Sequence, residues 1–177
     1  FYFMQKLVDG EQVENIAEAT VFPSARLSHR VPFGTGKALS DAVERASGVG
    51  FYSPRTFADL KGFFDQLPVC FQSGPKLFLD GLSEPLQDFL HGQNADSQLQ
   101  EVRANVATLA AFERRAKRWL NGFRAMKYAR HVAEQYYPYE EPNAAVSTLN
   151  AWIGQREPKD LSLKGWLTHF RLLERTI

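Results

Sequence analysis

The sequence predicts a mainly α-helical protein, an irregular helical bundle or α-solenoid-like domain of about seven helices with an extended N-terminal arm. Apolar residues recur at three- and four-residue steps beyond residue 33, which is the spacing of one helix face. Gly, Pro and capping residues interrupt these stretches at helix length. Several expected helix starts lie about 18 residues apart, half the period of helix-pair repeats. No tetratricopeptide pattern accompanies that spacing, so the irregular bundle is preferred.

Length and composition indicate a folded protein of one-domain size. The chain has 177 residues, of which 44% are hydrophobic and 13% aromatic, enough for a substantial core. Its 21 basic and 20 acidic residues leave a net charge of +1. Dedicated polyanion-binding domains are usually strongly basic. A nucleic-acid function would therefore depend on local clustering of charge.

The cysteine content and the hydropathy pattern indicate a soluble intracellular protein. Cys70 is the one cysteine, which excludes an intramolecular disulfide and a cysteine-based zinc site. No stretch reaches the roughly 20 apolar residues of a transmembrane helix. Phe1 to Val8 is too short for a signal peptide. The chain begins at Phe1 with its first methionine at position 4, which is compatible with import into an organelle such as the mitochondrial matrix.

Residues 1–32 are expected to form the arm, and residues 33–177 the helical domain. Phe1 to Val8 is aromatic and β-leaning, and Asp9-Gly10 is a turn signal, so a small hairpin is one alternative. Residues 11–20 alternate poorly as a strand partner. Pro23 and Pro32 favour an extended connector.

Two helices are expected to follow. Thr35 caps the first, which runs through Ser47 and stops at Gly48. Ser53-Pro54 begins the second, because proline at the first helical position costs no hydrogen bond. Pro68 is expected to end it. Its expected buried residues are Phe57, Leu60, Phe63, Phe64 and Leu67.

The next segment is expected to be irregular. Val69 to Phe71 is a short apolar run closed by Ser73-Gly74-Pro75, which indicates a loop or a brief strand. Ser83 then caps a short helix over 84–91, with Gly92 as its stop.

The longest periodic stretch is Asn94 to Tyr137. Asn94 or Asp96 is expected to cap it, and Asn121-Gly122 interrupts it. Glycine inside a helix costs about 1 kcal/mol relative to alanine. Either one long kinked helix or two helices with a tight connection would fit, and the second is preferred. The expected apolar face is Val102, Val106, Leu109, Phe112, Ala116, Leu120 and Phe123.

Two compact helices are expected at the C-terminal end. Pro142 begins the first and Gly154 ends it, and Asp160 or Ser162 caps the second. Their expected buried residues are Val146, Leu149, Trp152, Ile153, Leu163, Trp166, Leu167, Phe170 and Leu173.

Catalytic and metal-binding motifs are weak throughout. Gly34-Thr35-Gly36-Lys37 resembles a phosphate loop, but Val31 and Ala38 stand where that motif needs glycine and a hydroxyl residue. No histidine belongs to an HExxH motif or a close pair, and Cys70 has no base nearby in sequence. We therefore expect no cofactor, no metal and no catalytic residues, although an enzyme site assembled from distant residues stays an alternative.

A basic stripe is the main functional candidate. Its side chains fall opposite the apolar face of the central stretch. In decreasing order of preference it fits a solvated surface, a protein partner, or nucleic acid bound through phosphates. The residues are Arg114, Arg115, Lys117, Arg118, Arg124, Lys127 and Arg130.

Aromatic residues at termini and loops are the second candidate. Exposed aromatic side chains are enriched where proteins bind proteins. They would otherwise fold back and cover the ends of the bundle. The residues are Phe1, Tyr2, Phe3, Phe51, Tyr52, Tyr136, Tyr137 and Tyr139.

The function expected from the sequence is a non-catalytic accessory or adaptor subunit that binds proteins within a larger assembly. Nucleic-acid binding through residues 114–130 is the first alternative. The expected partner-binding residues are Phe1, Tyr2, Phe3, Arg114, Arg118, Arg124, Lys127, Tyr136, Tyr137 and Tyr139.

Overall fold

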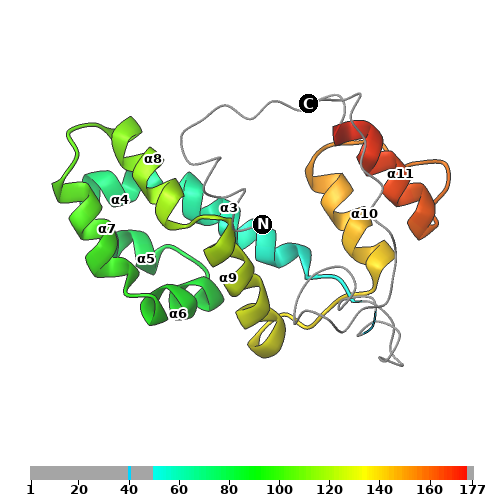
Figure 1. The fold of residues 1–177 in the computed structure, drawn as a ribbon, viewed down its shortest axis with the longest axis horizontal. Coiled ribbons are helices and arrows are strands. Elements are labelled where there is room, and N and C mark those ends of the chain that lie inside the picture. The colour runs from blue at the N-terminus through cyan, green and yellow to red at the C-terminus, as the bar shows by residue number, and fades with distance from the viewer. Residues whose placement is uncertain (1–39, 41–49, 175–177) are drawn as a thin grey trace. The chain divides into compact units, whose positions relative to one another are not determined.

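The computed structural model describes residue 40 and residues 50–174, and these residues are mainly helical (Figure 1), as the sequence predicts. Apart from helices, the described part contains an isolated antiparallel bridge between Phe51 and Glu140. The helices of that part are α3 (Pro54–Asp65), α4 (Leu67–Ser73), α5 (Pro75–Asp80), α6 (Glu84–Gly92), α7 (Ala95–Ala104), α8 (Leu109–Trp119), α9 (Gly122–Gln135), α10 (Pro142–Trp152) and α11 (Leu163–Glu174).

Several expectations fall on residues outside the described ranges. They are the arm or hairpin over 1–32, the glycine-rich Gly34 to Lys37 segment and the helix expected from Thr35 to Ser47. These stay predictions.

The described residues belong to two compact units. The larger unit is Tyr52–Pro138 and contains α3 to α9. The C-terminal unit contains Phe51 and the residues from Tyr139 onward, with α10 and α11.

The larger unit is built around one apolar cluster. Phe63 is fully buried, and its ring meets those of Phe78 and Trp119 at centroid distances of 5.2 and 6.2 Å. Helix α4 packs on α5 and α8, and helix α7 packs on α5, α6 and α8. These helices lie together at one end of the unit (Figure 1). Helix α9 packs on α3 and α6. The expected burial of Phe63 and Leu67 is confirmed.

Side-chain caps explain where the helices of this unit begin. Ser53 Oγ accepts the N–H of Arg55 at 3.3 Å at the start of α3, where Pro54 lies in the first turn. At the start of α9, Asn121 Oδ1 accepts the N–H groups of Phe123 at 3.1 Å and Arg124 at 3.2 Å. These bonds satisfy N–H groups that a helix end leaves without partners.

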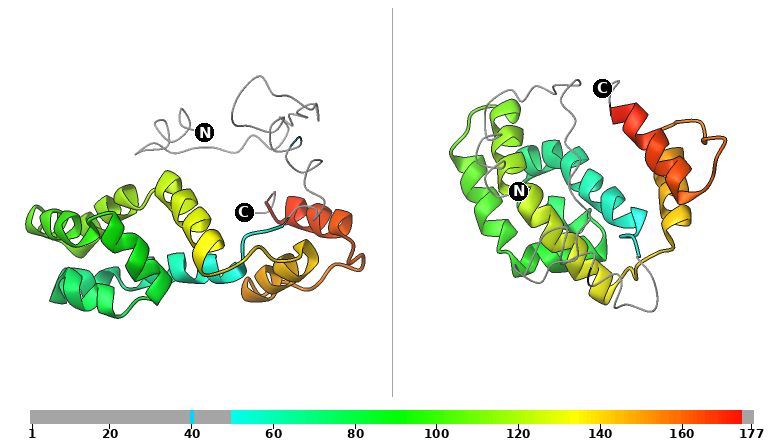
Figure 2. Two further views of the ribbon diagram at one scale, coloured as in Figure 1. Left: turned by 90° about the horizontal axis from the view of Figure 1, so that it is seen from below. Right: turned by 45° about the vertical axis from the view of Figure 1, so that its right-hand side comes forward.

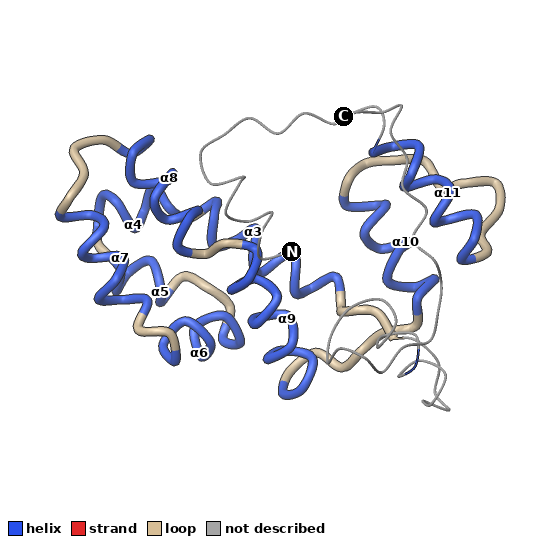
Figure 3. Tube along the Cα trace, in the orientation of Figure 1, coloured by secondary structure: helices blue, strands red, loops and turns tan. Residues whose placement is uncertain are grey.

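The break at Asn121-Gly122 is therefore real, and the two-helix alternative is confirmed. Helices α8 and α9 run in different directions on either side of it (Figure 2). A second break, which the sequence analysis missed, separates α7 from α8 (Figure 3). There Thr108 Oγ1 caps α8 by accepting the N–H of Ala111 at 3.3 Å. The apolar spacing does not reveal this break, because it continues across it. Val102 precedes the connection between the two helices, Val106 lies in it and Leu109 follows it, and all three pack against the core.

The prediction of a loop or strand at Val69 to Phe71 is wrong, because these residues belong to α4. Pro68 does not end the preceding helix; it lies in the first turn of α4, where its missing N–H costs nothing. Leu67 and Cys70, three residues apart, are both fully buried. Packing of that face against α5 and α8 overrides the local β preference.

The C-terminal unit contains a helical hairpin, in which α10 begins and ends as predicted and α11 begins as predicted. Glu141 caps α10 by accepting the N–H of Ala144 at 3.0 Å, and Gly154 follows α10 with a φ of 68° that favours glycine. Ser162 Oγ accepts the N–H of Gly165 at 3.2 Å at the start of α11. Trp166 is buried, with an exposed fraction of 2%.

Several residues expected in buried faces are exposed instead. Periodicity alone cannot assign such residues as buried or exposed. It indicates which side of a helix faces the core, but not how much of that side the neighbouring helices cover. They are Phe57, Phe123, Trp152, Ile153, Leu163 and Leu167.

Candidate functional site

The strongest candidate site is a basic surface on α8 and α9. Residues 109–130 contain seven basic residues and one acidic residue, Glu113, a net charge of +6. The preceding residues of the same unit, 52–108, contain four basic and seven acidic residues, a net charge of −3. The larger unit is thus strongly polarised although the whole chain is nearly neutral. We define the α8–α9 basic surface by its exposed cationic residues, Arg114, Lys117, Arg118, Lys127 and Arg130.

Two arginines of the predicted stripe donate hydrogen bonds to backbone carbonyl groups. Arg124 is half-buried; its guanidinium donates to the carbonyl oxygen of Trp119 and lies 4.7 Å from the Trp119 ring centroid. Arg115 donates to the carbonyl oxygen of Asn105 at 3.3 Å. Both arginines satisfy carbonyl groups at helix ends, as cationic side chains commonly do. The structure therefore gives Arg124 a structural role in addition to its predicted one.

Apolar side chains accompany the charges on α9. Phe123 is 49% exposed and Met126 44% exposed, and both belong to the outward side of the helix. Lys127 Nζ lies 4.8 Å from the Phe123 ring centroid, within the range of a cation–π contact. A single helical periodicity continued across Asn121-Gly122 predicts Phe123 in the core. This prediction is wrong, because α9 begins a new helix after its cap at Asn121 and Phe123 is exposed.

The predicted tyrosines are held by acidic residues of the larger unit. The Tyr136 hydroxyl bonds to Asp88, and partial burial, followed by the nearby Asp88 charge, raises the pKa of Tyr136. His131 Nε2 lies 3.0 Å from Asp88 Oδ2, so α9 and its end are joined to α6 at one carboxylate. The Tyr136 side chain is 36% exposed.

Tyr137 and Tyr128 share a second carboxylate. Both hydroxyls bond to Asp59 of α3, and burial is the main cause that raises the pKa of each tyrosine. The Arg55 guanidinium lies 6.0 Å from the Tyr137 ring centroid. Sequence reasoning missed this cluster because Tyr128 and Asp59 are 69 residues apart.

Of the remaining aromatic residues in the predicted partner-binding set, the structure describes one, Tyr139. Tyr139 is 50% exposed and belongs to the C-terminal unit, where its Cβ lies close beside Gly50. Phe1, Tyr2 and Phe3 lie outside the described residues. Tyr139 thus belongs to the C-terminal unit, whereas the other described residues of the predicted set belong to the larger unit. These are Arg114, Arg118, Arg124, Lys127, Tyr136 and Tyr137.

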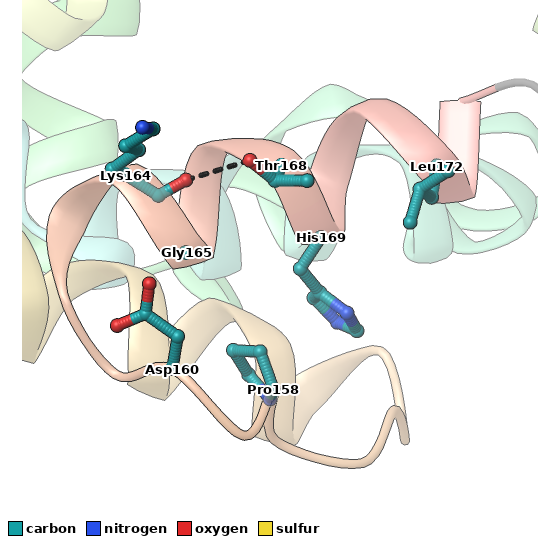
Figure 4. Close-up of a pocket in the computed structure, with 7 residues that line it drawn as sticks. All are labelled: Pro158, Asp160, Lys164, Gly165, Thr168, His169 and Leu172. Carbon is teal, nitrogen blue, oxygen red and sulfur yellow. Dashed lines mark hydrogen bonds between the residues drawn. The ribbon is translucent and has the colours of Figure 1, made fainter.

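A pocket of about 350 Å³ lies between α11 and the loop before it (Figure 4). The Asp160 carboxylate accepts the N–H of Ser162 at 2.9 Å, which is the main cause that lowers the pKa of Asp160. His169 Nε2 lies 2.8 Å from Asn150 Oδ1. These polar groups support the hairpin itself. The lining residues are Pro158, Asp160, Lys164, Gly165, Thr168, His169 and Leu172.

Another pocket, of about 360 Å³, lies beside the basic surface between α7 and α8. Trp119 Nε1 donates to Gln98 Oε1 at its edge. Among the residues the structure describes, no group of three or more His, Cys, Asp or Glu side chains is arranged to hold a metal ion. Nor does any helix in the described ranges have the length and hydropathy needed to cross a bilayer.

Cys70 is a buried thiol of low reactivity. Burial raises its pKa to about 11 from 9.0, against the opposing charge of Arg103. Because the thiolate is the reactive form, we expect Cys70 in the native protein to react with iodoacetamide at pH 8 at least about 100-fold more slowly than free cysteine. Mass spectrometry of timed samples measures this rate, with the chain unfolded in guanidinium as the control. Equal rates in the native and unfolded chains would contradict the buried position of α4.

Comparison with known proteins found no match to this chain among family models, characterised proteins or solved structures.

Proposed function

We propose that this chain is a non-catalytic accessory subunit that binds other proteins within a larger assembly. The observation that carries this proposal is the α8–α9 basic surface, where the exposed Phe123 and Met126 share the outward face of α9 with the cations Lys127 and Arg130. Solvated helix faces carry charges, but large apolar side chains among them are characteristic of surfaces that bind proteins.

Exposed apolar residues of the C-terminal unit give further support. Six large apolar side chains of the α10–α11 hairpin and its loop have exposed fractions of 36% or more. Burying apolar surface is the main favourable term in most protein association. A chain with exposed apolar side chains in both units suits a subunit that binds more than one neighbour. The residues are Trp152, Ile153, Leu161, Leu163, Leu167 and Leu172.

Nucleic-acid binding through the same surface is the alternative function, favoured by the net charge of +6 over residues 109–130. Proteins that bind single strands usually stack bases on exposed aromatic rings. Here Trp119 is 8% exposed and covered by Arg124, while Lys127 lies over the Phe123 ring. The surface therefore offers cations without a free stacking platform, and we prefer the protein partner.

We place the protein inside the cell, and an organelle such as the mitochondrial matrix is part of the proposal. A thiol that is reduced and buried, as Cys70 is, suits a reducing compartment.

Capture of partners from a lysate of the source cells tests the proposed function. We expect a stoichiometric protein to copurify with the wild-type chain and to be lost from the Arg114→Glu, Lys127→Glu double variant. The reason is that the two new glutamates would face the carboxylates of an acidic partner, and like charges placed together at an interface cost several kcal/mol. The matched control is Lys159→Glu with Arg171→Glu, two exposed charges of the C-terminal unit, which should retain the partner.

Two outcomes would reject the proposal. One is that no stoichiometric protein copurifies with the wild-type chain. The other is that nuclease treatment removes the captured material, which would assign the surface to nucleic acid.

A further inference from the structure

We infer that the α8–α9 basic surface recognises an acidic protein segment that carries carboxylates next to an apolar side chain. The inference deepens the proposed function and rests on it. The outward face of α9 specifies this chemistry of the partner, and the charges of α8 add to the positive charge of the surface.

Helix α9 divides sharply into an inward and an outward side. Tyr128, Ala129 and Val132 are buried, with exposed fractions of 0, 7 and 0%. Phe123, Met126 and Arg130 follow one another at steps of three and four residues on the opposite side, and Lys127 is four residues after Phe123. Residues at those steps are neighbours on one helix face. Two apolar side chains and two cations therefore share the outward face.

Cations lie beside the apolar pair on the outward face of α9. The contact of Lys127 with the Phe123 ring holds an ammonium group directly beside the apolar surface. Arg114, Lys117 and Arg118 extend the positive charge along α8, which Leu120 and Asn121 connect to α9. A segment that matches this pattern has an apolar residue against Met126 and the exposed part of Phe123, with carboxylates beside it. Its carboxylates then meet Lys127 and Arg130.

A protein segment fits this surface better than a phosphate backbone or a lipid surface. Phosphate contacts alone need no apolar neighbours, and the aromatic rings beside the cations have a side chain over them. A helix that lies in a membrane interface uses a broad apolar face. The broad apolar face of α9 is already buried in the core, and Phe123 with Met126 is a small patch. Methionine adapts readily to protein side chains, which suits Met126 to this role.

Binding of synthetic probes to the full chain tests the inference by fluorescence anisotropy. The main probe is a labelled peptide of Glu, Leu and Ala in which Glu outnumbers Leu, and the matched probe has Ser in place of Leu. A single-stranded RNA and vesicles containing phosphatidylserine serve as the other anionic probes. We expect the Leu-containing peptide to bind more tightly than all three, with affinity that falls as salt rises.

Variants of the outward face identify the contacts. Phe123→Ala with Met126→Ala should weaken binding of the Leu-containing peptide by about tenfold or more, because the lost apolar area no longer favours the complex. Trp152→Ala with Ile153→Ala removes a similarly exposed apolar pair from the C-terminal unit and should leave binding unchanged. Lys127→Glu with Arg130→Glu should abolish it. Helical circular dichroism should match the wild type in each, since all these residues are exposed on their helices or next to a helix end.

Equal binding of the Leu and Ser peptides, or tighter binding of RNA or vesicles, would overturn the inference. So would an unchanged affinity in the Phe123→Ala, Met126→Ala variant. Failure here and failure of the proposed function are distinguishable. A stoichiometric partner that binds through this surface but lacks an acidic segment overturns the inference alone. Selective peptide binding without any stoichiometric partner in the lysate overturns the accessory function alone.

Discussion

Phe63→Ala is expected to destabilise the larger unit by about 3–5 kcal/mol, the range for removing a large ring from a packed core. Phe63 is fully buried, and its ring contacts those of Phe64, Phe78 and Trp119 at centroid distances of 5.4, 5.2 and 6.2 Å. The variant would leave a cavity between α3, α5 and α8 that these rings cannot fill by small movements. Domains of this size have only about 5–15 kcal/mol of stability in total. Urea denaturation followed by tryptophan fluorescence measures the change.

Phe57→Ala is the matched control for this prediction. Phe57 lies in the same helix, but 43% of its side chain is exposed. Its replacement should change the free energy of unfolding by less than about 1 kcal/mol. A loss at Phe57 as large as that at Phe63 would mean that α3 presents another face to the core.

Trp166→Ala is expected to have a similar effect on the C-terminal unit, about 3–5 kcal/mol. Trp166 is 2% exposed, stacks on Phe170 at 6.1 Å and meets the edge of His169 at 5.9 Å. It is the largest buried side chain of a hairpin with few other buried residues. Hydrogen exchange measured on peptides from α10 and α11 should show greatly reduced protection in the variant.

Leu167→Ala tests the same helix one residue further on. Leu167 is 48% exposed, so its removal should change protection in α10 and α11 only slightly. Comparable losses of protection in the two variants would show that the assigned buried face of α11 is wrong.

Most helix boundaries were predictable because they depend on short-range hydrogen bonds. Ser53, Asn121 and Ser162 each cap a helix through a side-chain oxygen within three residues of the N–H it accepts. Such interactions depend on a few adjacent residues and can therefore be predicted from the sequence. Val69 to Phe71 was misassigned because its helical state depends on packing of α4 against α5 and α8, which lie elsewhere in the sequence.

The candidate site was predictable in part for the same reason. The cations at Arg114, Arg118 and Lys127 are exposed, as expected for charges opposite an apolar stripe. The outward position of Phe123 was missed, since it depends on a new helical phase after Asn121. The contacts of Tyr136 with Asp88 and of Tyr137 with Asp59 join residues that no sequence pattern connects.

The sequence by itself determined the helical class, most helix starts and the charge segregation of residues 109–130, because each depends on local propensity or composition. The tertiary structure alone decided which rings are buried. Phe57 and Phe63 have the same chemistry in one helix, yet one is 43% exposed and the other 0%. The difference arises because rings from α5 and α8 pack on Phe63, and such contacts between distant parts of the chain are a long-range property of packing. The same packing leaves Phe123 and Met126 outside the core and creates the surface on which the proposed function depends.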